Sequence, residues 1–375
     1  MRLFSRLLVA TTILSTGATT ANAEVNVVTS IKPVHSLVAA VMEGVGTPHL
    51  IVEGAASPHT YALKPSQAAK LQNADIVFWV GDQLEAFLEK PIEGIATKAT
   101  SVTLFEAHGL NQIKFREGGA FDSHDHNDHA EDKHDDHGHD DHGHDDHAED
   151  KHDGHGHDDH AEDKHDGHGH DDHAEDKHDG HGHDDHAEDK HDDHGHDDHG
   201  HDEFDPHVWL DPVNAKAIVH EIEEALSDAD PANAGVYEAN ADALMAKLDM
   251  LVEEVQAELD PVKDRGFIVF HDAYQHFEMR FGMRAVGSIT VSPEVMPGAE
   301  RIRELQDKVK SLDASCVFSE PQFAPKLVST VTENTGAGAG VLDPLGASIK
   351  DGPGLYFTLI RNMGSALKGC LSGNR

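Results

Sequence analysis

Basic residues are scarce in this chain of 375 residues. It has 29 Lys and Arg against 70 Asp and Glu, and its formal net charge is −41 at pH 7 with neutral His. An acidic excess of this size repels nucleic acids and anionic membranes and attracts cations. We therefore expect no nucleic-acid partner, and the composition favours a cationic ligand.

Long apolar runs are also lacking. A membrane-spanning helix needs about 20 apolar residues, and the stretch from Leu7 to Leu14 is too short. That stretch follows basic residues and precedes Ala21-Asn22-Ala23, which is typical of a cleavable secretory signal peptide. We expect residues 1–23 to be removed and the mature protein, from Glu24, to be periplasmic and not membrane-spanning. A retained anchor is the alternative.

Cysteine is nearly absent, with Cys316 and Cys370 as the only two. In an exported protein a lone pair is expected to form a disulfide. It would tie the last predicted helix to a core strand, and closing a loop of about 50 residues adds roughly 4 kcal/mol in the chain-entropy description. Two free buried thiols or a metal site are the alternatives, although a thiolate site needs more soft ligands than the sequence offers.

Histidine is abundant, and 26 of the 34 histidines lie between Glu117 and Glu203. A 13-residue unit fills 145–157, 158–170 and 171–183 in tandem, and it recurs once more with Asp193 in place of Gly. The tract has 35 acidic residues and 5 lysines, which gives −30 and leaves −11 for the rest of the chain. Imidazole binds borderline transition metals and is mostly neutral at pH 7. The tract therefore predicts a disordered insertion that binds a transition metal.

Binding by the tract should be weak, because its ligands are not pre-organised and lose conformational entropy on binding. We expect it to collect metal ions, and a solvated acidic linker without a metal-binding role is the alternative. The accessory ligands that we single out are the His-Gly-His pairs of the three intact repeats: His155, His157, His168, His170, His181 and His183.

Outside the signal peptide and the tract, short apolar strands alternate with helical patterns in two series. This alternation is typical of parallel sheets with helices on both faces. Between the series, Pro231 and Pro261 delimit one helix of about 29 residues, roughly 43 Å long. We predict an α/β protein with two Rossmann-like lobes, 24–230 and 261–375, joined by a linker helix at 231–260. The strands are expected at 25–31, 49–52, 75–80 and 101–104, and then at 267–270, 285–289, 316–319 and 340–342.

Proteins of this architecture bind ligands at the carboxyl ends of their strands. His59 follows a predicted strand in a loop stiffened by Pro58, His207 lies between two Asp-Pro dipeptides, and His271 directly ends a strand. Three neutral imidazoles with one carboxylate or water suit tetrahedral zinc, and Asp343 is the fourth candidate. Each could instead cap a turn. The remaining histidines are expected to be structural or exposed: His35, His49, His108, His220 and His276.

Four motifs surround these residues. They are Ser57-Pro-His-Thr-Tyr-Ala-Leu-Lys-Pro-Ser66, Asp205-Pro-His-Val-Trp-Leu-Asp-Pro212, Phe270-His-Asp-Ala-Tyr274 and Leu342-Asp-Pro-Leu-Gly346. In this order, with the long helix between the second and third, they resemble the periplasmic zinc-binding proteins of ABC importers, the ZnuA type. The resemblance covers nearly all of the mature chain outside the tract. Members of that family also carry a charged, His-rich loop before the second motif.

The resemblance implies that His59, His207 and His271 bind Zn²⁺ in a cleft between the lobes. Asp343 matches the fourth family position, as a direct ligand or behind a water or a nearby acid. Manganese-binding relatives carry a carboxylate where this chain has His271, and imidazole at that position favours zinc. The resemblance further implies the Cys316–Cys370 disulfide. The implied function is capture of zinc for an inner-membrane ABC permease, by a monomer and without catalysis.

Two other functions stay open at this point. One is a stand-alone periplasmic zinc buffer, in which the folded part carries the tract. The other is a zinc hydrolase, because three histidines and an open fourth position also describe catalytic zinc. A hydrolase needs a general base near the metal-bound water, and Asp272 and Glu294 are conceivable. However, no motif such as His-Glu-x-x-His supports either.

Overall fold

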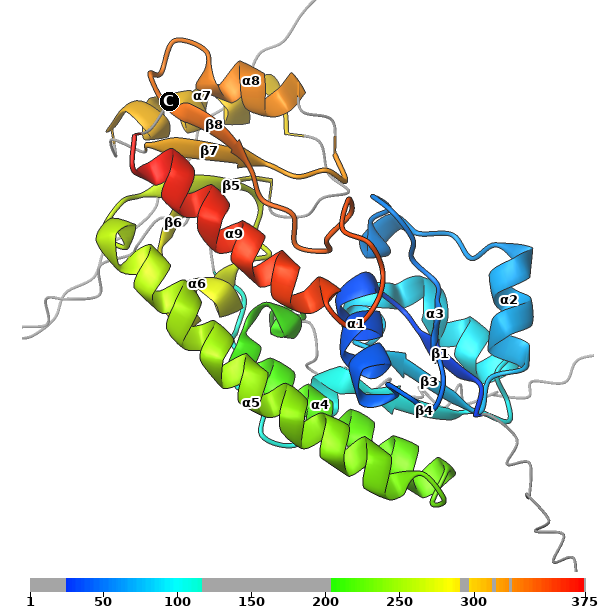
Figure 1. Ribbon diagram of the computed structural model, residues 1–375. Helices are drawn as coiled ribbons and strands as arrows, with labels where there is room; N and C mark the ends of the chain where they lie inside the picture. Colours follow the sequence, from blue (N-terminus) through cyan, green and yellow to red (C-terminus); the bar gives the residue numbers. More distant parts are fainter. Residues whose placement is uncertain (1–24, 117–203, 291–296, 312–314, 324–325, 374–375) are drawn as a thin grey trace, which may run out of the picture. The chain divides into compact units, whose positions relative to one another are not determined.

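The computed structural model describes residues 25–116, 204–290, 297–311, 315–323 and 326–373 (Figure 1). All of them belong to one compact unit. The predicted signal peptide (1–23) and the His-rich tract (117–203), with its accessory histidines, lie outside these ranges. Among the described helices, none combines the length and the apolar character that crossing a bilayer requires.

The N-terminal lobe contains a parallel four-stranded sheet in the order β2-β1-β3-β4. Strand β3 reads Ile-Val-Phe-Trp and is buried throughout, as expected where helices cover both faces of a parallel sheet. The strands match the four predicted ones to within a few residues. Their bounds are β1 Val27–Thr29, β2 His49–Leu50, β3 Ile76–Trp79 and β4 Thr100–Thr103, and the helices are α1 Lys32–Val41, α2 Pro65–Gln72, α3 Asp82–Gly94 and α4 Pro212–Ala229.

The C-terminal lobe repeats this arrangement with a parallel sheet in the order β6-β5-β7-β8. In both sheets the first strand lies inside and the second lies at an edge. The predicted α/β fold with two parallel sheets is therefore confirmed. The bounds are β5 Phe267–His271, β6 Ala285–Thr290, β7 Cys316–Ser319 and β8 Gly338–Val341, and the helices are α6 Gln275–Phe281, α7 Ala299–Ser311, α8 Lys326–Thr332 and α9 Leu355–Leu371.

The long helix α5 runs over Ala234–Leu259. It begins three residues later than predicted, because 231–233 form a turn after Asp230. Its buried residues recur every three or four positions, from Tyr237 to Leu259, which makes one apolar stripe along the helix. This stripe packs against α1 and α4 of the N-terminal lobe and against α9 of the C-terminal lobe (Figure 1). The lobe boundaries predicted at 230 and 260 stay predictions.

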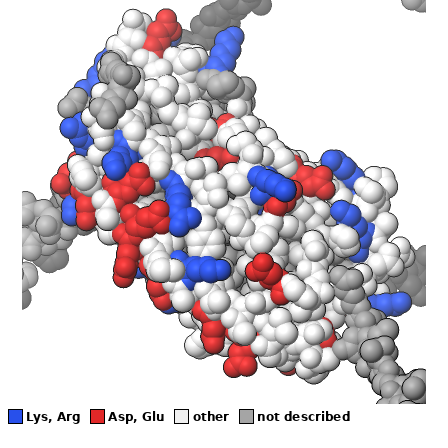
Figure 2. Space-filling model, viewed as in Figure 1, with Lys and Arg blue, Asp and Glu red and all other residues white. Residues whose placement is uncertain are grey.

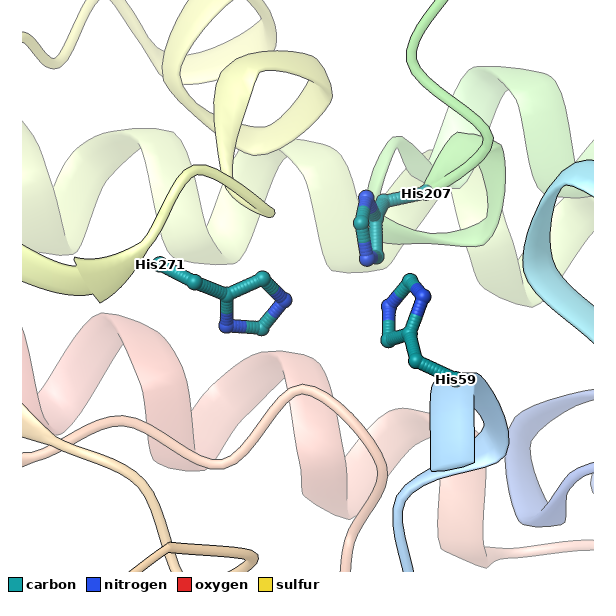
Figure 3. A group of neighbouring side chains, drawn as sticks. All are labelled: His59, His207 and His271. Atoms are coloured by element: carbon teal, nitrogen blue, oxygen red, sulfur yellow. The ribbon is translucent and has the colours of Figure 1, made fainter. Parts of the chain in front are cut away.

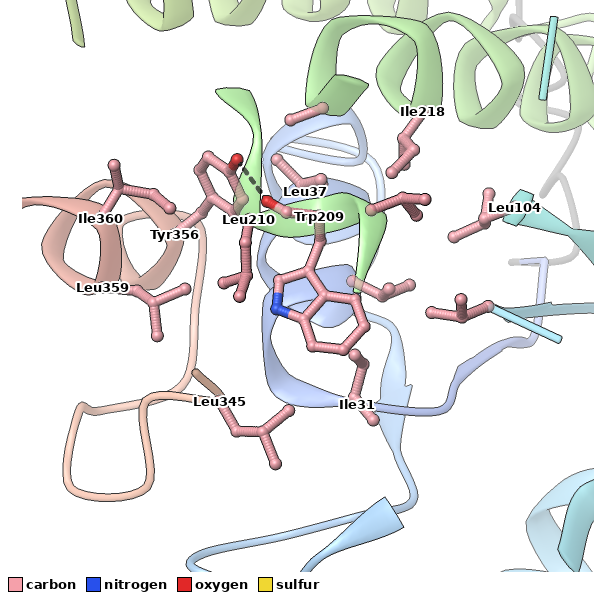
Figure 4. Packing of buried hydrophobic residues seen from close by; sticks show 14 of the residues in the cluster. Ile31, Leu37, Leu104, Trp209, Leu210, Ile218, Leu345, Tyr356, Leu359 and Ile360 are labelled. Carbon is pink, nitrogen blue, oxygen red and sulfur yellow. Dashed lines mark hydrogen bonds between the residues drawn. The ribbon is translucent and has the colours of Figure 1, made fainter. Parts of the chain in front are cut away.

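One hydrophobic core extends through both lobes, and Trp209 lies fully buried within it. The indole packs among side chains such as Ile31, Leu37 and Leu345 (Figure 4). Its Nε1 donates to the carbonyl of Pro344 at 2.9 Å, and the Tyr356 hydroxyl donates to the Trp209 carbonyl at 2.7 Å. These contacts fix the segment after His207 to residues of the C-terminal lobe.

The predicted disulfide is confirmed. It joins Cys316 at the start of β7 to Cys370 near the end of α9, 54 positions later in the sequence. On the molecular face shown in Figure 2, Lys and Arg side chains lie scattered among acidic ones and do not form a separate basic patch.

Candidate metal centre

His59 lies in a short 3₁₀ segment, Pro58–Thr60, which follows β2. Pro58 occupies the first turn and is buried, and the φ angle of its ring suits that turn. A polar network holds the segment that follows. Gln67 of α2 donates from Nε2 to the carbonyl of Ile51 at 2.6 Å and to the hydroxyl of Tyr61 at 2.8 Å. Backbone restriction and these neighbours therefore place His59.

His207 is placed by the carboxylate of Asp205, two residues earlier. Asp205 is fully buried, and its Oδ1 accepts hydrogen bonds from the backbone N–H of His207 at 3.0 Å and from its Nδ1 at 2.6 Å. Donation from Nδ1 leaves the Nε2 lone pair free, as in the carboxylate–histidine pairs of metal sites. The next three residues, Val208–Leu210, are buried, which anchors the turn.

His271 is the last residue of β5, and its carboxylate partner is Glu320, directly after β7. Nδ1 of His271 donates to Oε1 of Glu320 at 2.7 Å. Nε2 is buried and has no hydrogen-bond partner among the described residues. Sequence reasoning missed Glu320 and gave Asp205 no role. The position of Glu320 after a strand was the available signal, because candidate ligands such as His271 were chosen on that ground.

The three imidazoles point toward one another (Figure 3). Ring centroids are 5.5 Å apart for His59 and His207, 5.8 Å for His59 and His271, and 5.3 Å for His207 and His271. One nitrogen of each ring lies within 4.8 Å of the others, and this group could hold a metal ion. The structure thus brings together the three histidines that the sequence singled out.

The environment shifts the pKa values of the histidines and of Asp205 in different directions. Burial, and then the two neighbouring imidazoles, lower the pKa of His59 to about 2. Burial also opposes protonation of His271, but the Glu320 carboxylate outweighs it and raises the pKa of that imidazole. Burial would raise the pKa of Asp205, and the adjacent His207 outweighs burial and lowers it. The site therefore combines a neutral imidazole with imidazoles that are paired with carboxylates.

Asp343 does not belong to the group of possible ligand atoms that His59, His207 and His271 form. Its carboxylate accepts backbone N–H bonds from Leu345 at 3.1 Å, Gly346 at 2.9 Å and Ala347 at 2.6 Å. It also accepts a bond from Nε2 of Gln322 at 3.1 Å. These bonds engage the carboxylate with its own loop and with Gln322, and only the contact with Gln322 is one that the sequence does not reveal.

Of the two candidate bases for hydrolysis, only Asp272 lies among the described residues. Both oxygens of Asp272 accept hydrogen bonds from Arg116, one of them at 3.0 Å. Burial raises the pKa of Asp272 to about 6, against the effect of that guanidinium. Glu294 lies outside the described residues. Asp272 is therefore engaged in an ion pair with Arg116.

The other described histidines have different surroundings. His35 is buried in the first turn of α1, and its Nε2 bonds the Pro48 carbonyl at 3.2 Å. His276 is fully buried, with Nε2 at 3.0 Å from the carbonyl of Asp205, and is a packing residue. His49, His108 and His220 are exposed.

Comparison with known proteins identifies the family. Residues 27–370 match the family described as zinc-uptake complex component A periplasmic, ZnuA. The high-affinity zinc uptake system protein ZnuA of Brucella suis biovar 1 (strain 1330) is 51% identical over 356 residues, which cover 95% of this chain and 94% of that protein. The protein of the same name from Yersinia pestis is 31% identical, over 92% of this chain and 91% of its own.

Solved structures support the same fold. The crystal structure of a ZnuA deletion mutant with zinc bound aligns with a TM-score of 0.63 and 20% identity, covering 93% of this chain and 98% of that one. At this identity the likeness shows the fold alone, whereas the family match rests on the sequence. The chain therefore belongs to the ZnuA family of periplasmic components of zinc-uptake complexes.

Proposed function

We propose that this protein captures Zn²⁺ in the periplasm and delivers it to an inner-membrane ABC permease. The observation that carries the proposal is the convergence of His59, His207 and His271 from three separate segments, with two of the rings held by buried carboxylates. Relatives named as high-affinity zinc uptake proteins support the choice of cargo.

The donor set favours zinc among the common divalent ions. Imidazole nitrogen suits zinc, whereas calcium, magnesium and manganese prefer oxygen ligands. The charges also fit a dication, because burying an ion is costly unless nearby charges compensate it. Asp205 and Glu320 lie directly behind two of the ligands and are almost fully buried, and together they supply two negative charges.

The lobes are linked closely enough that we propose small movements for uptake and release. Arg280 of α6 binds Asp211 of the N-terminal lobe through two hydrogen bonds of 2.6 and 2.8 Å. Lys32 of α1 donates to the carbonyl of Ile349 at 2.7 Å. His271 belongs to the C-terminal lobe and the other two ligands to the N-terminal lobe, and a slight separation would break the site.

Growth under zinc limitation tests this function. Deletion of the gene should impair growth with a zinc chelator, and added zinc should restore it. A gene encoding His207→Ala should fail to complement, whereas one encoding His220→Ala, an exposed position on α4, should complement fully. Normal growth of the deletion strain in a host without a second zinc importer would refute the transport function and favour a buffer.

The His-rich tract (117–203) is proposed to collect zinc at low affinity, and the protein is proposed to act as a monomer. Zinc titration of the mature chain and of a variant without the tract addresses the first point. The number of weakly bound zinc ions should fall on deletion while one tight site stays. An unchanged stoichiometry would show that the tract is only an acidic linker.

A further inference from the structure

The cavity beside the three imidazoles has polar atoms that the ligand set does not use. Ser57, Glu320 and Gln322 line it together with the three histidines. Oγ of Ser57, Oε2 of Glu320 and Oε1 of Gln322 are buried, and none has a hydrogen-bond partner within the described ranges. An unpaired buried polar atom costs about 1–3 kcal/mol, so three of them on one small cavity call for a ligand.

The size of the cavity limits what that ligand is. The cavity has a volume of about 10 Å³, which is close to the space that one water molecule needs. Apolar side chains, among them Trp209 and Phe323, make up most of the remaining wall. That volume is too small to enclose a ligand the size of an amino acid.

The hydrogen-bonding character of the wall follows from Asp343. A carboxylate only accepts hydrogen bonds, so the amide of Gln322 must turn Nε2 toward it, at 3.1 Å. Oε1 of Gln322 is thereby fixed as an acceptor on its other side. Oε2 of Glu320 is also an acceptor, and the Ser57 hydroxyl can act as one.

A wall of acceptors matches a water molecule bound to a metal. Such a water uses a lone pair on the metal and has two protons to donate, whereas an anion offers no proton and is repelled by acceptor oxygens. We propose that Ser57, Glu320 and Gln322 form a seat for one water that completes the coordination of Zn²⁺, and that Asp343 positions Gln322 and does not bind the metal. This inference rests on the proposed zinc site and specifies its fourth ligand.

Cobalt(II), which reports coordination through its visible absorption, tests the seat in the mature full-length chain. The assay contains a chelator that keeps the weaker sites free of metal. Gln322→Leu should weaken Co²⁺ and Zn²⁺ binding about tenfold, as for other residues that support a metal site. It should also let added azide replace the water, which shifts the absorption. Gln306→Leu is the matched control. Gln306 of α7 donates to the carbonyl of Thr330 in α8 and does not line the cavity, so this substitution should change neither property.

Asp343→Asn separates the positioning role from direct ligation. If Asp343 acts through Gln322, the cobalt absorption of this variant keeps its shape and affinity falls no further than in Gln322→Leu. A changed absorption and a loss much greater than in Gln322→Leu would identify Asp343 as a ligand and overturn the inference.

Ser57 gives a second test that does not depend on the fold around Gln322. Ser57→Ala should weaken zinc binding and Ser57→Thr, which keeps the hydroxyl, should restore it, with equal melting temperatures of the metal-free proteins. If both Ser57 variants and Gln322→Leu bound zinc as tightly as the unchanged chain, the proposed water seat would be refuted. Failure of the zinc site itself would look different, because the unchanged chain would then bind no tight zinc ion.

Discussion

His59 and His271 contribute the same chemical group to one site, but the protein holds them by different means. His271 is paired with a buried carboxylate at 2.7 Å, and His207 is held similarly by Asp205. His59 has no hydrogen-bond partner at either ring nitrogen among the described residues, and it depends on Pro58 and the packing of its segment. The difference predicts that the carboxylate-backed ligands contribute to stability as well as to binding, whereas His59 contributes to binding alone.

The largest effect is expected from removal of a ligand. His271→Ala and His59→Ala should each weaken zinc binding by more than the roughly 100-fold that supporting residues reach. Metal-free His271→Ala should also lose about 3 kcal/mol of unfolding free energy, because Glu320 is left buried without its partner. His59→Ala should keep the stability of the unchanged chain. Chelator competition and urea unfolding measure the two quantities, and equal stability losses in both variants would contradict the comparison.

Supporting carboxylates should have the next largest effect. Asp205→Asn and Glu320→Gln keep the shape of the side chain and remove the charge behind a ligand. Zinc affinity should fall by about 10- to 100-fold in each. Glu254→Gln is the control, because Glu254 forms an exposed ion pair with Arg361 and its loss should leave affinity unchanged. If Asp205→Asn bound zinc as tightly as the Glu254→Gln control, the backbone alone would be sufficient to place His207.

The pH dependence of the metal-free protein should differ between the two kinds of ligand. His59 has a pKa of about 2 in the folded protein and 6.5 as its ordinary value. Below pH 6.5 the unfolded chain therefore binds a proton that the folded chain refuses, and stability falls as the pH falls. The slope is about 1.4 kcal/mol per pH unit. His59→Gln should remove this loss and be more stable than the unchanged chain at pH 5, by about 2 kcal/mol.

His271 should show the opposite sign. Its pKa is raised in the folded protein, so its contribution to stability is complete below pH 6.5 and disappears as the pH rises through the folded pKa. His271→Gln should therefore lose most stability relative to the unchanged chain in acid. Urea unfolding at pH 5, 6 and 7 gives both signs, and parallel pH profiles of the two variants would reject the assignment.

Much of the histidine cluster was predictable, because its three histidines follow strands or lie in rigid Pro-containing turns. Apolar runs bounded by turn residues also located the strands to within a few positions. What the sequence could not show is which loops meet. Glu320 supports His271 across 49 residues, and Asp343 bonds its own loop and Gln322. The pairings of Glu320 with His271 and of Gln322 with Asp343 depend on how the loops after β7 and β8 pack, and local patterns carry no information about that.

The smallest effect on zinc affinity is expected from Pro58, which restricts the backbone next to His59. Pro58→Ala keeps the imidazole and frees the backbone before it, and restricting a backbone with Pro is worth about 0.4–1 kcal/mol. Zinc affinity should therefore fall about two- to fivefold. Pro65→Ala, at the start of α2, removes a similar restriction away from the ligands and should lower stability without changing affinity. If Pro58→Ala binds zinc as tightly as Pro65→Ala, packing around the 3₁₀ segment is sufficient to place His59. The remaining difference between His59 and His271 is then the carboxylate partner of His271.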